Sequence, residues 1–328
     1  MKEIKIDKTN AGTRLDKIVS KYLDKAPKSF VYKMLRKKNI VLNDKKAAGN
    51  EIVQDGDVIR LYLADDTIAK FKGEKPEHKS SFSQEDIRSL ICYEDENIIA
   101  FNKPHGMLSQ RANAGDFSLN DLLLGYLVDQ TTDFFTPGVA NRLDRNTSGI
   151  VLAGKNLAAS RCLSEMIKKR QISKHYAALV KGIVSKAETI DGYLRKDEKT
   201  NLVQIDPEPS EDAKRIVTAY EPICHNEKVT LLDVDLITGK SHQIRAHLAH
   251  ISHPIIGDIK YGDPHINSRF SAEYGLKRQL LHAYKLTFEN TENELKYLNG
   301  KTIFADFPTD FRQIIEGEEL WLPGTAED

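Results

Sequence analysis

One short run near the middle of the chain carries residues that could do chemistry. It reads Val-Ala-Asn-Arg-Leu-Asp-Arg-Asn-Thr-Ser-Gly over 139–149 and places Asp144 between Arg142 and Arg145. Neighbouring positive charges favour the ionised form of a carboxylate, and an ionised carboxylate can attack without first losing a proton. A hairpin with a surface ion pair would have a similar sequence, and such pairs contribute little. Other segments must therefore decide between the two interpretations.

Two of these segments lie where predicted strands begin or end. Residues 102–106, Asn-Lys-Pro-His-Gly, follow an apolar run, and the Pro and Gly predict a turn there. Lys103 or His105 in this turn could face a phosphate or an active cleft. Tyr176 starts the predicted strand 176–180, where its ring could stack on a base. An ordinary turn and a core tyrosine are the plainer interpretations.

A third segment, 238–262, packs basic and amide side chains around glycines. Arg245 is a candidate partner for a carboxylate, because guanidinium stays charged and can bind bidentately. Four histidines in this segment suggest a metal, but their spacing matches no familiar zinc pattern and no acid or cysteine completes one: His242, His247, His250 and His253. We predict no metal. A fourth segment, 279–288, is interpreted as a core strand with His282 at its start.

Cofactor motifs and membrane signals are missing from the sequence. It has no Gly-x-x-x-x-Gly-Lys-Ser/Thr, no Gly-x-Gly-x-x-Gly and no paired Cys-x-x-Cys, so we expect no cofactor, ATP and nicotinamide included. No apolar run approaches membrane-spanning length, and the N-terminus lacks the apolar core of a signal peptide. Three widely spaced cysteines fit a reducing cytoplasm. Nothing demands more than a monomer.

The net charge of zero hides an asymmetry along the 328 residues. Residues 1–63 hold 15 Lys and Arg against 8 Asp and Glu, whereas the rest holds 33 against 40. A small basic unit on an acidic protein is typical of a tethered nucleic-acid-binding module. Crowded cations at Lys33, Arg36 and Lys37, and Arg14 before them, are its candidate RNA contacts, although a charge run is often only a solvated helix face.

The patterning divides the chain into three parts, with an α+β fold overall. Residues 1–63 contain two amphipathic helices, over 13–23 and over 29–38 with Ser29 as N-cap, and short strands near 40–42 and 57–63. Residues 64–85 are rich in lysine and poor in apolar residues and are interpreted as a linker. Residues 86–328 predict a catalytic domain built on a mainly antiparallel mixed sheet with flanking helices, among them 119–128 and 158–168.

Five motifs in chain order resemble the RluA-type pseudouridine synthases. They are Lys103-Pro-His-Gly106, Arg142-Leu-Asp-Arg-Asn-Thr-Ser-Gly149, Lys174-His-Tyr176, Thr238-Gly-Lys-Ser-His-Gln-Ile-Arg245 and His253-Pro-Ile-Ile-Gly-Asp258. The resemblance runs from about residue 90 to the end. Residues 12–63 resemble the alpha-L RNA-binding module of ribosomal protein S-four type, which many larger members carry in front. Two positions depart from the usual family pattern: Asn141 replaces a common His, and Lys240 a frequent Arg.

The resemblance implies a reaction and a set of roles. The family isomerises uridine in RNA to pseudouridine without a cofactor. By resemblance, Asp144 is the nucleophile or base, Arg142 enters the RNA and helps expel the target base, and Tyr176 lies against the uracil. Arg245 pairs with the aspartate and Ile244 packs beside the base. Lys103, from the turn at 102–106, is a further predicted RNA contact.

Elementary chemistry agrees with that reaction. The glycosidic bond must move from N1 to C5 of uracil, and a stacked base cannot rotate, so it must be flipped out at a cost of a few kcal/mol. The carboxylate could trap the sugar cation or remove a sugar proton, and the sequence leaves both routes open. We expect 23S ribosomal RNA of the large subunit as the substrate. Transfer RNA, a non-catalytic RNA-binding or ribosome-assembly factor, and a metal hydrolase using the histidines are the alternatives.

Overall fold

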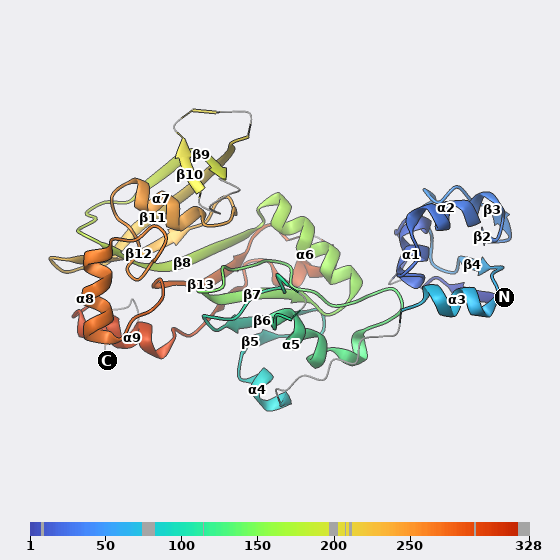
Figure 1. Ribbon diagram of the computed structural model, residues 1–328, viewed down its shortest axis with the longest axis horizontal. Coiled ribbons are helices and arrows are strands. Elements are labelled where there is room, and N and C mark those ends of the chain that lie inside the picture. The colour runs from blue at the N-terminus through green and yellow to red at the C-terminus, as the bar shows by residue number, and fades with distance from the viewer. Residues whose placement is uncertain are drawn as a thin grey trace.

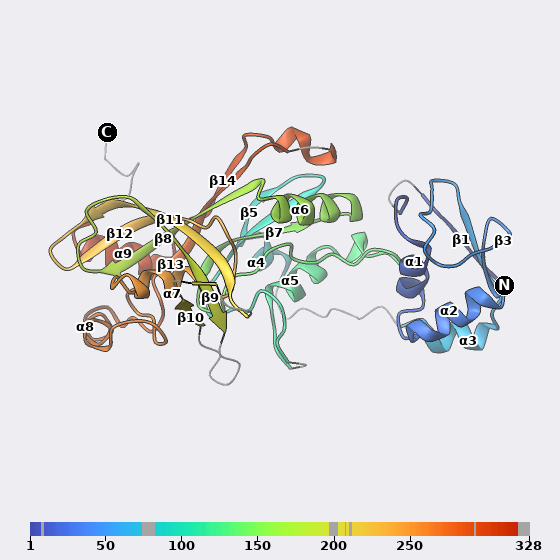
Figure 2. The same ribbon diagram turned by 90° about the horizontal axis from the view of Figure 1, so that it is seen from above.

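The computed structural model describes residues 1–7, 10–73, 83–113, 115–196, 203–206, 208–209, 212–291 and 293–320. Its first unit, here called the N-terminal module (residues 1–73), has a four-stranded sheet in the order β1-β4-β2-β3. The elements of the module are β1 (Lys2–Lys5), α1 (Leu15–Tyr22), α2 (Lys28–Arg36), β2 (Ile40–Leu42), β3 (Lys45–Lys46), β4 (Val58–Leu61) and α3 (Asp65–Phe71). The module lies at one end of an elongated molecule (Figures 1 and 2).

The two predicted helices of the module bury the apolar stripe that predicted them. Leu15, Ile18 and Val19 of α1 pack with Val31 and Leu35 of α2 in one cluster, together with residues of β2 and β4. Asn43 and Asp44 both have positive φ, as the turn between β2 and β3 requires. The prediction that Ser29 is the N-cap of the second helix is wrong, because α2 begins at Lys28 and its N-cap is Pro27.

The segment expected to be a linker, 64–85, is helical at its start. Helix α3 covers Asp65–Phe71, and its Ile68 and Phe71 pack against the core of the module. The sequence prediction fails here because a seven-residue helix with only two core contacts leaves a weak periodic signal. The lysine-rich part at 74–82 lies outside the described residues. Helix α4 (Gln84–Arg88) follows, with Ser83 and Asp86 forming a capping box.

The second unit is built on one large sheet, mostly antiparallel and flanked by helices, which agrees with the mixed α+β expectation. Its ten strands run in the order β10-β9-β11-β12-β8-β13-β7-β6-β5, with β14 paired to β13. Among the described residues, the β7–β13 pair is parallel and the other strand pairs of this sheet are antiparallel. The strands are β5 (Ile91–Glu94), β6 (Ile98–Lys103), β7 (Ser148–Gly154), β8 (Ile172–Lys181), β9 (Glu188–Lys196), β10 (Val203–Asp206), β11 (Lys214–His225), β12 (Val229–Asp235), β13 (Leu281–Phe288) and β14 (Thr302–Phe304).

Helices cover both faces of this sheet, because successive strand residues point to opposite sides. Ile99 and Phe101 of β6 face one side and pack with α5, whereas Ile98 and Ala100 face the other and pack with α6. Along β8, Tyr176 and its alternate neighbours join the first of these clusters. The helices are α5 (Leu119–Tyr126), α6 (Leu157–Lys169), α7 (Gln243–His250), α8 (Pro264–Tyr274) and α9 (Thr309–Gly317), with short 3-10 turns η1 (Val128–Gln130) and η2 (Asn293–Leu298). None of the described helices has the length and apolar character needed to span a membrane.

A small set of contacts ties the module to the second unit. Phe134 packs against the module core and stacks on Tyr22, with 6.1 Å between ring centroids. The polar ties are Lys21 Nζ to the Phe134 carbonyl at 3.0 Å, Lys72 Nζ to Asp133 at 2.9 Å, and Arg161 of α6 to the Ala11 carbonyl at 3.1 Å and to the Thr13 hydroxyl. These contacts are called the module interface below.

Candidate active site

The residues singled out in the middle of the sequence line one cavity of about 800 Å³. It opens on the face of the sheet that carries α5 and α7, since Tyr176, Leu143 and Ile244 belong to the core cluster of that face. Asp144 and Arg142 come from the loop before β7, and Ile244 and Arg245 come from the first turn of α7. Segments a hundred residues apart therefore meet at this cavity.

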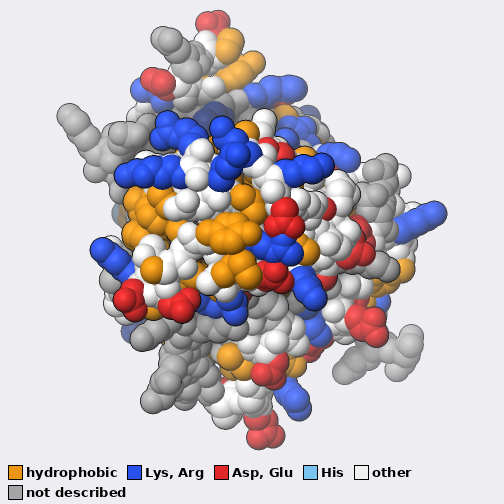
Figure 3. Space-filling model, turned by 90° about the vertical axis from the view of Figure 1, so that its right-hand side faces the viewer, with side chains coloured by type: hydrophobic (Ala, Val, Ile, Leu, Met, Phe, Trp, Pro, Cys, Tyr) orange, Lys and Arg blue, Asp and Glu red, His pale blue; other side chains and the backbone are white. Residues whose placement is uncertain are grey.

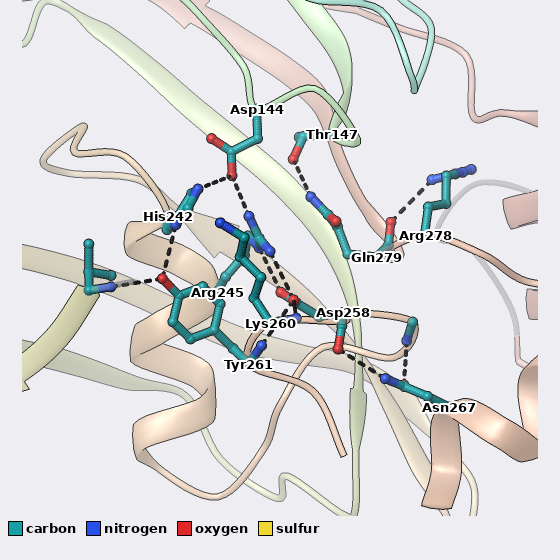
Figure 4. A network of polar contacts seen from close by, with 12 residues as sticks. Asp144, Thr147, His242, Arg245, Asp258, Lys260, Tyr261, Asn267, Arg278 and Gln279 are labelled. Atoms are coloured by element: carbon teal, nitrogen blue, oxygen red, sulfur yellow. Dashed lines mark hydrogen bonds and ion pairs between the residues drawn. The ribbon is translucent and has the colours of Figure 1, made fainter. Parts of the chain in front are cut away.

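Asp144 is held by a buried arginine. Its Oδ2 accepts a hydrogen bond from Arg245 Nη1 at 2.9 Å, and its side chain is 27% exposed, so it remains open to the cavity. Arg245 in turn binds Asp258 bidentately, with Nε at 2.6 Å and Nη2 at 2.9 Å from the two carboxylate oxygens. Figure 4 shows Arg245 between the two carboxylates, with Oδ2 of Asp144 turned toward it. The sequence prediction that Arg245 faces a carboxylate agrees with this geometry.

Arg245 and Asp258 each stabilise the charged form of the other. Burial lowers the pKa of Arg245, but hydrogen bonds and attraction from Asp258, and then Asp144, outweigh burial and raise it. Burial likewise raises the pKa of Asp258, yet the Arg245 hydrogen bond and charge bring it below its ordinary value. The buried Arg245–Asp258 pair is therefore held in its charged form.

Tyr176 and Ile244 form an apolar part of the cavity wall next to the Asp144 carboxylate. Both side chains are buried, at 5% and 4% exposure, and both line the cavity. Burial, and then the negative charge of Asp144, raises the pKa of Tyr176 well above its usual value, so its hydroxyl stays neutral. Tyr176 lies in the middle of β8 and not at the start of a strand, as the sequence had suggested.

Lys103 differs from its expected role as a substrate contact. Its side chain is fully buried, and Nζ donates to the carbonyls of Pro104 at 3.0 Å, Met107 at 2.8 Å and Arg145 at 3.2 Å. Burial lowers its pKa to about 7, which the charge of Asp144 partly opposes. Lys103 fixes the backbone beside Asp144 and does not face the cavity. An interior lysine was not predicted, because lysines are rarely buried unless paired.

Three side chains complete the anchoring of the Asp144 loop. The Ser109 hydroxyl is 3.0 Å from both the amide nitrogen and the carbonyl oxygen of Leu143, and Gln279 Nε2 donates to the Thr147 hydroxyl at 3.2 Å. Asn141, the departure from the family pattern, accepts from the Leu152 amide at 2.8 Å and donates to the Ile150 carbonyl. The loop is therefore pinned on both sides of the carboxylate.

Arg142 remains free to meet a ligand. Its side chain is exposed at the rim of the cavity, and no hydrogen bond or ion pair joins it to another residue in the described part of the chain. The neighbouring Arg145 instead donates to the Gly106 carbonyl at 3.0 Å. The sequence placed both arginines beside Asp144, and only the structure separates the anchored one from the free one.

The candidate cations of the module are far from this cavity in the fold. Lys33, Arg36 and Lys37 are exposed on and just after α2. Arg14 is largely engaged, because its guanidinium binds Asp16 through Nε and Nη2 at 3.0 Å each. Within the described residues, no group of three or more His, Cys, Asp or Glu could hold a metal ion.

Sequence reasoning missed three residues around Arg245. Asp258, Tyr261 and His242 all lie within contact of Arg245 or Asp144. Asp258 and Tyr261 lie in the turn after α7, and His242 directly precedes that helix. Their motif was visible, but the signal that would have assigned them, an acidic residue poised to pair with a buried arginine, needs the tertiary fold.

Comparisons with known proteins give the same assignment as the geometry. Residues 97–250 match the family model described as RNA pseudouridylate synthase. The chain is 30% identical to "Ribosomal large subunit pseudouridine synthase C" of Vibrio cholerae over 89% of its own length and 90% of that protein. A Pasteurella multocida protein of the same name is 30% identical over 94% and 91%.

Another relative and a solved structure extend the likeness. An uncharacterized RNA pseudouridine synthase of Mycoplasma genitalium is 32% identical over 88% of this chain and 89% of that protein. The structure titled "Human RNA Pseudouridylate Synthase Domain Containing 4" shares the fold, with a TM-score of 0.62, 21% identity and coverage of 74% of this chain and 97% of that one.

The family model and these relatives place the protein among the enzymes that modify RNA bases, and the chain belongs to the RluA-type family of RNA pseudouridine synthases. It is an isomerase that converts uridine to pseudouridine in RNA.

Proposed function

We propose that this enzyme modifies uridines of large-subunit ribosomal RNA, 23S RNA in a bacterium, with Asp144 as the reacting carboxylate. The relatives of matching length are named for the ribosomal large subunit, and they align with about nine-tenths of this chain. The observation that carries the residue assignment is the 2.9 Å contact between Asp144 and Arg245 at the wall of a cavity of about 800 Å³. A cavity of that size holds a flipped nucleotide.

The reaction moves one glycosidic bond. The bond between C1′ and N1 breaks, the uracil turns in place, C5 bonds to C1′, and the proton on C5 is lost while N1 gains one. Asp144 acts either by bonding to C1′ as the base leaves or by removing a sugar proton. In both routes the carboxylate reacts as the anion, and its Oδ2 faces the positive charge of Arg245.

The cavity wall keeps the released base in place. Tyr176 and Ile244 present ring and aliphatic surface beside Asp144, so a detached uracil meets an apolar, water-poor boundary. The neutral Tyr176 hydroxyl can take up the C5 proton only while it gives its own proton to another acceptor, so it is a candidate proton relay. Arg142, exposed and unpaired at the rim, suits entry into the RNA stack in place of the flipped base.

We assign RNA binding to the N-terminal module, as a unit like that of ribosomal protein S-four. An end-on view of the module shows Lys and Arg side chains in a band along its upper side, above an apolar area (Figure 3). In Figure 1 the upper side carries α2 and β3. The exposed Lys33, Arg36 and Lys37 fit phosphate contacts, whereas Arg14 contributes less because Asp16 holds it.

Pseudouridine mapping of total RNA tests the proposal. Cells lacking this protein are complemented with wild type or with Asp144→Asn, which removes the charge and keeps the shape. We expect signal loss at defined uridines of large-subunit RNA, restored by wild type alone. Loss of the pseudouridine signal only in transfer RNA would identify transfer RNA as the substrate instead. Restoration of the signal by Asp144→Asn would show that Asp144 is not the reacting carboxylate. An unchanged map would favour a non-catalytic assembly role.

A further inference from the structure

The turn after α7 supplies a tyrosine that touches both groups facing Asp144. Tyr261 lies edge-on to His242, with 5.7 Å between ring centroids, and the Arg245 guanidinium lies 5.2 Å from the Tyr261 ring centroid. His242 Nε2 is 3.9 Å from Asp144 Oδ2, the oxygen that Arg245 also binds. Figure 4 shows His242 between Asp144 and Tyr261, with one ring nitrogen toward each.

Hydrogen bonds on the Tyr261 hydroxyl decide which nitrogen of His242 carries the proton. The hydroxyl oxygen accepts from the backbone amide of Val203 in β10 at 2.9 Å, and an amide can only donate. The hydroxyl keeps its own hydrogen to donate, and among the described residues its remaining hydrogen-bond partner is His242 Nδ1, 2.9 Å away. Nδ1 is then the acceptor, so the neutral ring carries its proton on Nε2, the nitrogen nearest Asp144.

The backbone of His242 is held in an uncommon conformation. It has φ 58° and ψ 11°, the left-handed region, at the residue before α7. Non-glycine residues rarely adopt this region, and such residues gather at functional sites. The conformation places the ring beside Asp144 instead of on the outer surface of the helix.

Burial favours a neutral His242 ring, and the charges around it act in both directions. Burial lowers its pKa; attraction by Asp144 opposes this, repulsion by Arg245 and Lys260 adds to it, and Asp258 opposes it. Asp144 therefore faces one permanent cation and one neutral donor. A protonated ring would add a second positive charge to Oδ2 and weaken the carboxylate as a nucleophile or base.

We propose that His242 is a positioning residue for Asp144, kept as the neutral Nε2–H tautomer by the Tyr261 hydroxyl. The proposal rests on the proposed role of Asp144. The ring steers Oδ2 toward Arg245 and itself, which leaves Oδ1 for the substrate. Because 3.9 Å exceeds hydrogen-bonding distance, the interaction between His242 Nε2 and Asp144 Oδ2 in the free enzyme is electrostatic.

Histidine-selective ¹⁵N NMR of the full-length protein tests the tautomer directly. The His242 signals are identified by their loss in His242→Asn, a variant that tolerates the left-handed backbone. We expect an unprotonated Nδ1 and a protonated Nε2 at pH 7.5, and loss of that preference in Tyr261→Phe. The opposite tautomer in wild type, or an unchanged one in Tyr261→Phe, overturns the proposal.

Single-turnover rates against pH on the mapped RNA test the consequence. The wild-type rate should fall as pH drops through the pKa of His242, below 6.5. Tyr261→Phe frees Nδ1 to bind a proton, so its acid limb should move to higher pH. His242→Asn should lose that limb and run at least about tenfold slower with unchanged RNA affinity, as expected for a misplaced reacting group.

Two controls separate the possible failures. His265→Asn, an exposed histidine on α8, should keep the wild-type rate and profile. Wild-type profiles in both Tyr261→Phe and His242→Asn overturn the positioning role. Turnover retained in Asp144→Asn instead defeats the proposed function, and the NMR result stands apart from it because that measurement needs no turnover.

Discussion

Asp258 decides the geometry of a site that it does not line. Its carboxylate is fully buried and binds two nitrogens of Arg245, and its Oδ1 also accepts from the amides of Lys260 and Tyr261. Arg245 therefore cannot rotate away from Asp144 without losing a bidentate pair. The charge that faces the substrate is set by a residue on the far side of the guanidinium.

Replacing Asp258 with Asn should destabilise the protein and slow turnover together. Removing one partner of a buried pair costs about 3–5 kcal/mol, and here the lower end applies because Arg245 keeps Asp144. Chemical denaturation measures the loss. The difference in unfolding free energy between wild type and Asp258→Asn should shrink as pH falls below 3.8. The pKa of Asp258 is lowered in the folded protein, so its ionised form stabilises the fold above that pH and this contribution disappears on protonation.

The matched control is Asp263→Asn, five residues after Asp258 in the chain. It weakens a surface ion pair between Asp263 and Lys181. Exposed pairs contribute about 0–1 kcal/mol, so this variant should behave almost as wild type. Equal losses in the two variants would show that the buried pair has no special weight.

Tyr176→Phe separates packing from proton transfer. The ring stays, so RNA affinity and the unfolding midpoint should hold, whereas turnover should fall about 10²-fold if the hydroxyl moves the proton. Rapid-quench kinetics on the mapped substrate gives the rate and filter binding gives the affinity. Wild-type turnover would confine Tyr176 to the wall of the cavity.

Among the secondary-structure elements, the contact between β7 and β13 leaves no room for a side chain at Gly149. Gly149 has φ +116°, and a Cβ there would lie 2.3 Å from the Ala283 carbonyl oxygen. Gly149 follows directly on the Asp144 loop, so the one parallel strand pair among the described residues of this sheet depends on a glycine.

Gly149→Ala should cost about 2 kcal/mol or more, from backbone strain and overpacking together. Gly300→Ala is its control, because Gly300 also has a positive φ but has open space around its Cβ position. This variant should lose only about 1 kcal/mol of unfolding free energy. Unfolding midpoints in urea compare them. Equal midpoints would show that β13 can move away.

Local patterns predicted most of the elements. The apolar run before residue 102 and the predicted strands 176–180 and 279–288 located β6, β8 and β13, and helical spacing located α1, α2, α5 and α6. The short helix α3 and the extent of β8 before Tyr176 were missed, since few apolar residues mark them. Strand order, with β8 between β12 and β13, was beyond a sequence argument because it depends on contacts across a hundred residues.

The same limit applied to the site. Asp144, Tyr176 and Arg245 were predicted from local sequence. Asp144 lies between two arginines, Tyr176 begins a predicted strand, and Arg245 lies in a basic segment around glycines. Lys103 was predicted to contact RNA from its place in a turn after an apolar run, yet it is buried and donates to three carbonyl oxygens. His242 was grouped with other histidines as a metal question, and only its distances to Tyr261 and Asp144 give it a role.

For the whole molecule, the proposed RNA contact of the module makes a prediction about salt. Replacing Lys33, Arg36 and Lys37 with Gln should weaken RNA binding and reduce its salt dependence, because each lost phosphate contact releases about one counterion fewer. These side chains are exposed, so folding should be unaffected. Affinity measured across a salt series gives the slope.

A second triple variant carries the same change of charge elsewhere. Lys277, Lys296 and Arg312 are exposed on the catalytic unit and do not line the cavity. Gln at all three should leave the slope as in wild type. Equal slopes in the two variants would mean that net charge, and not the band on the module, governs binding.

The module interface has a kinetic consequence. Arg161 lies on α6, whose C-terminal end, at Lys168, reaches the cavity rim, so one rigid helix joins the module to the site. RNA held by the module would meet Asp144 as an intramolecular partner, at an effective concentration in the millimolar range that short tethers give. Weakening the tie through Arg161→Ala would then raise KM for long RNA and leave a minimal stem-loop unaffected.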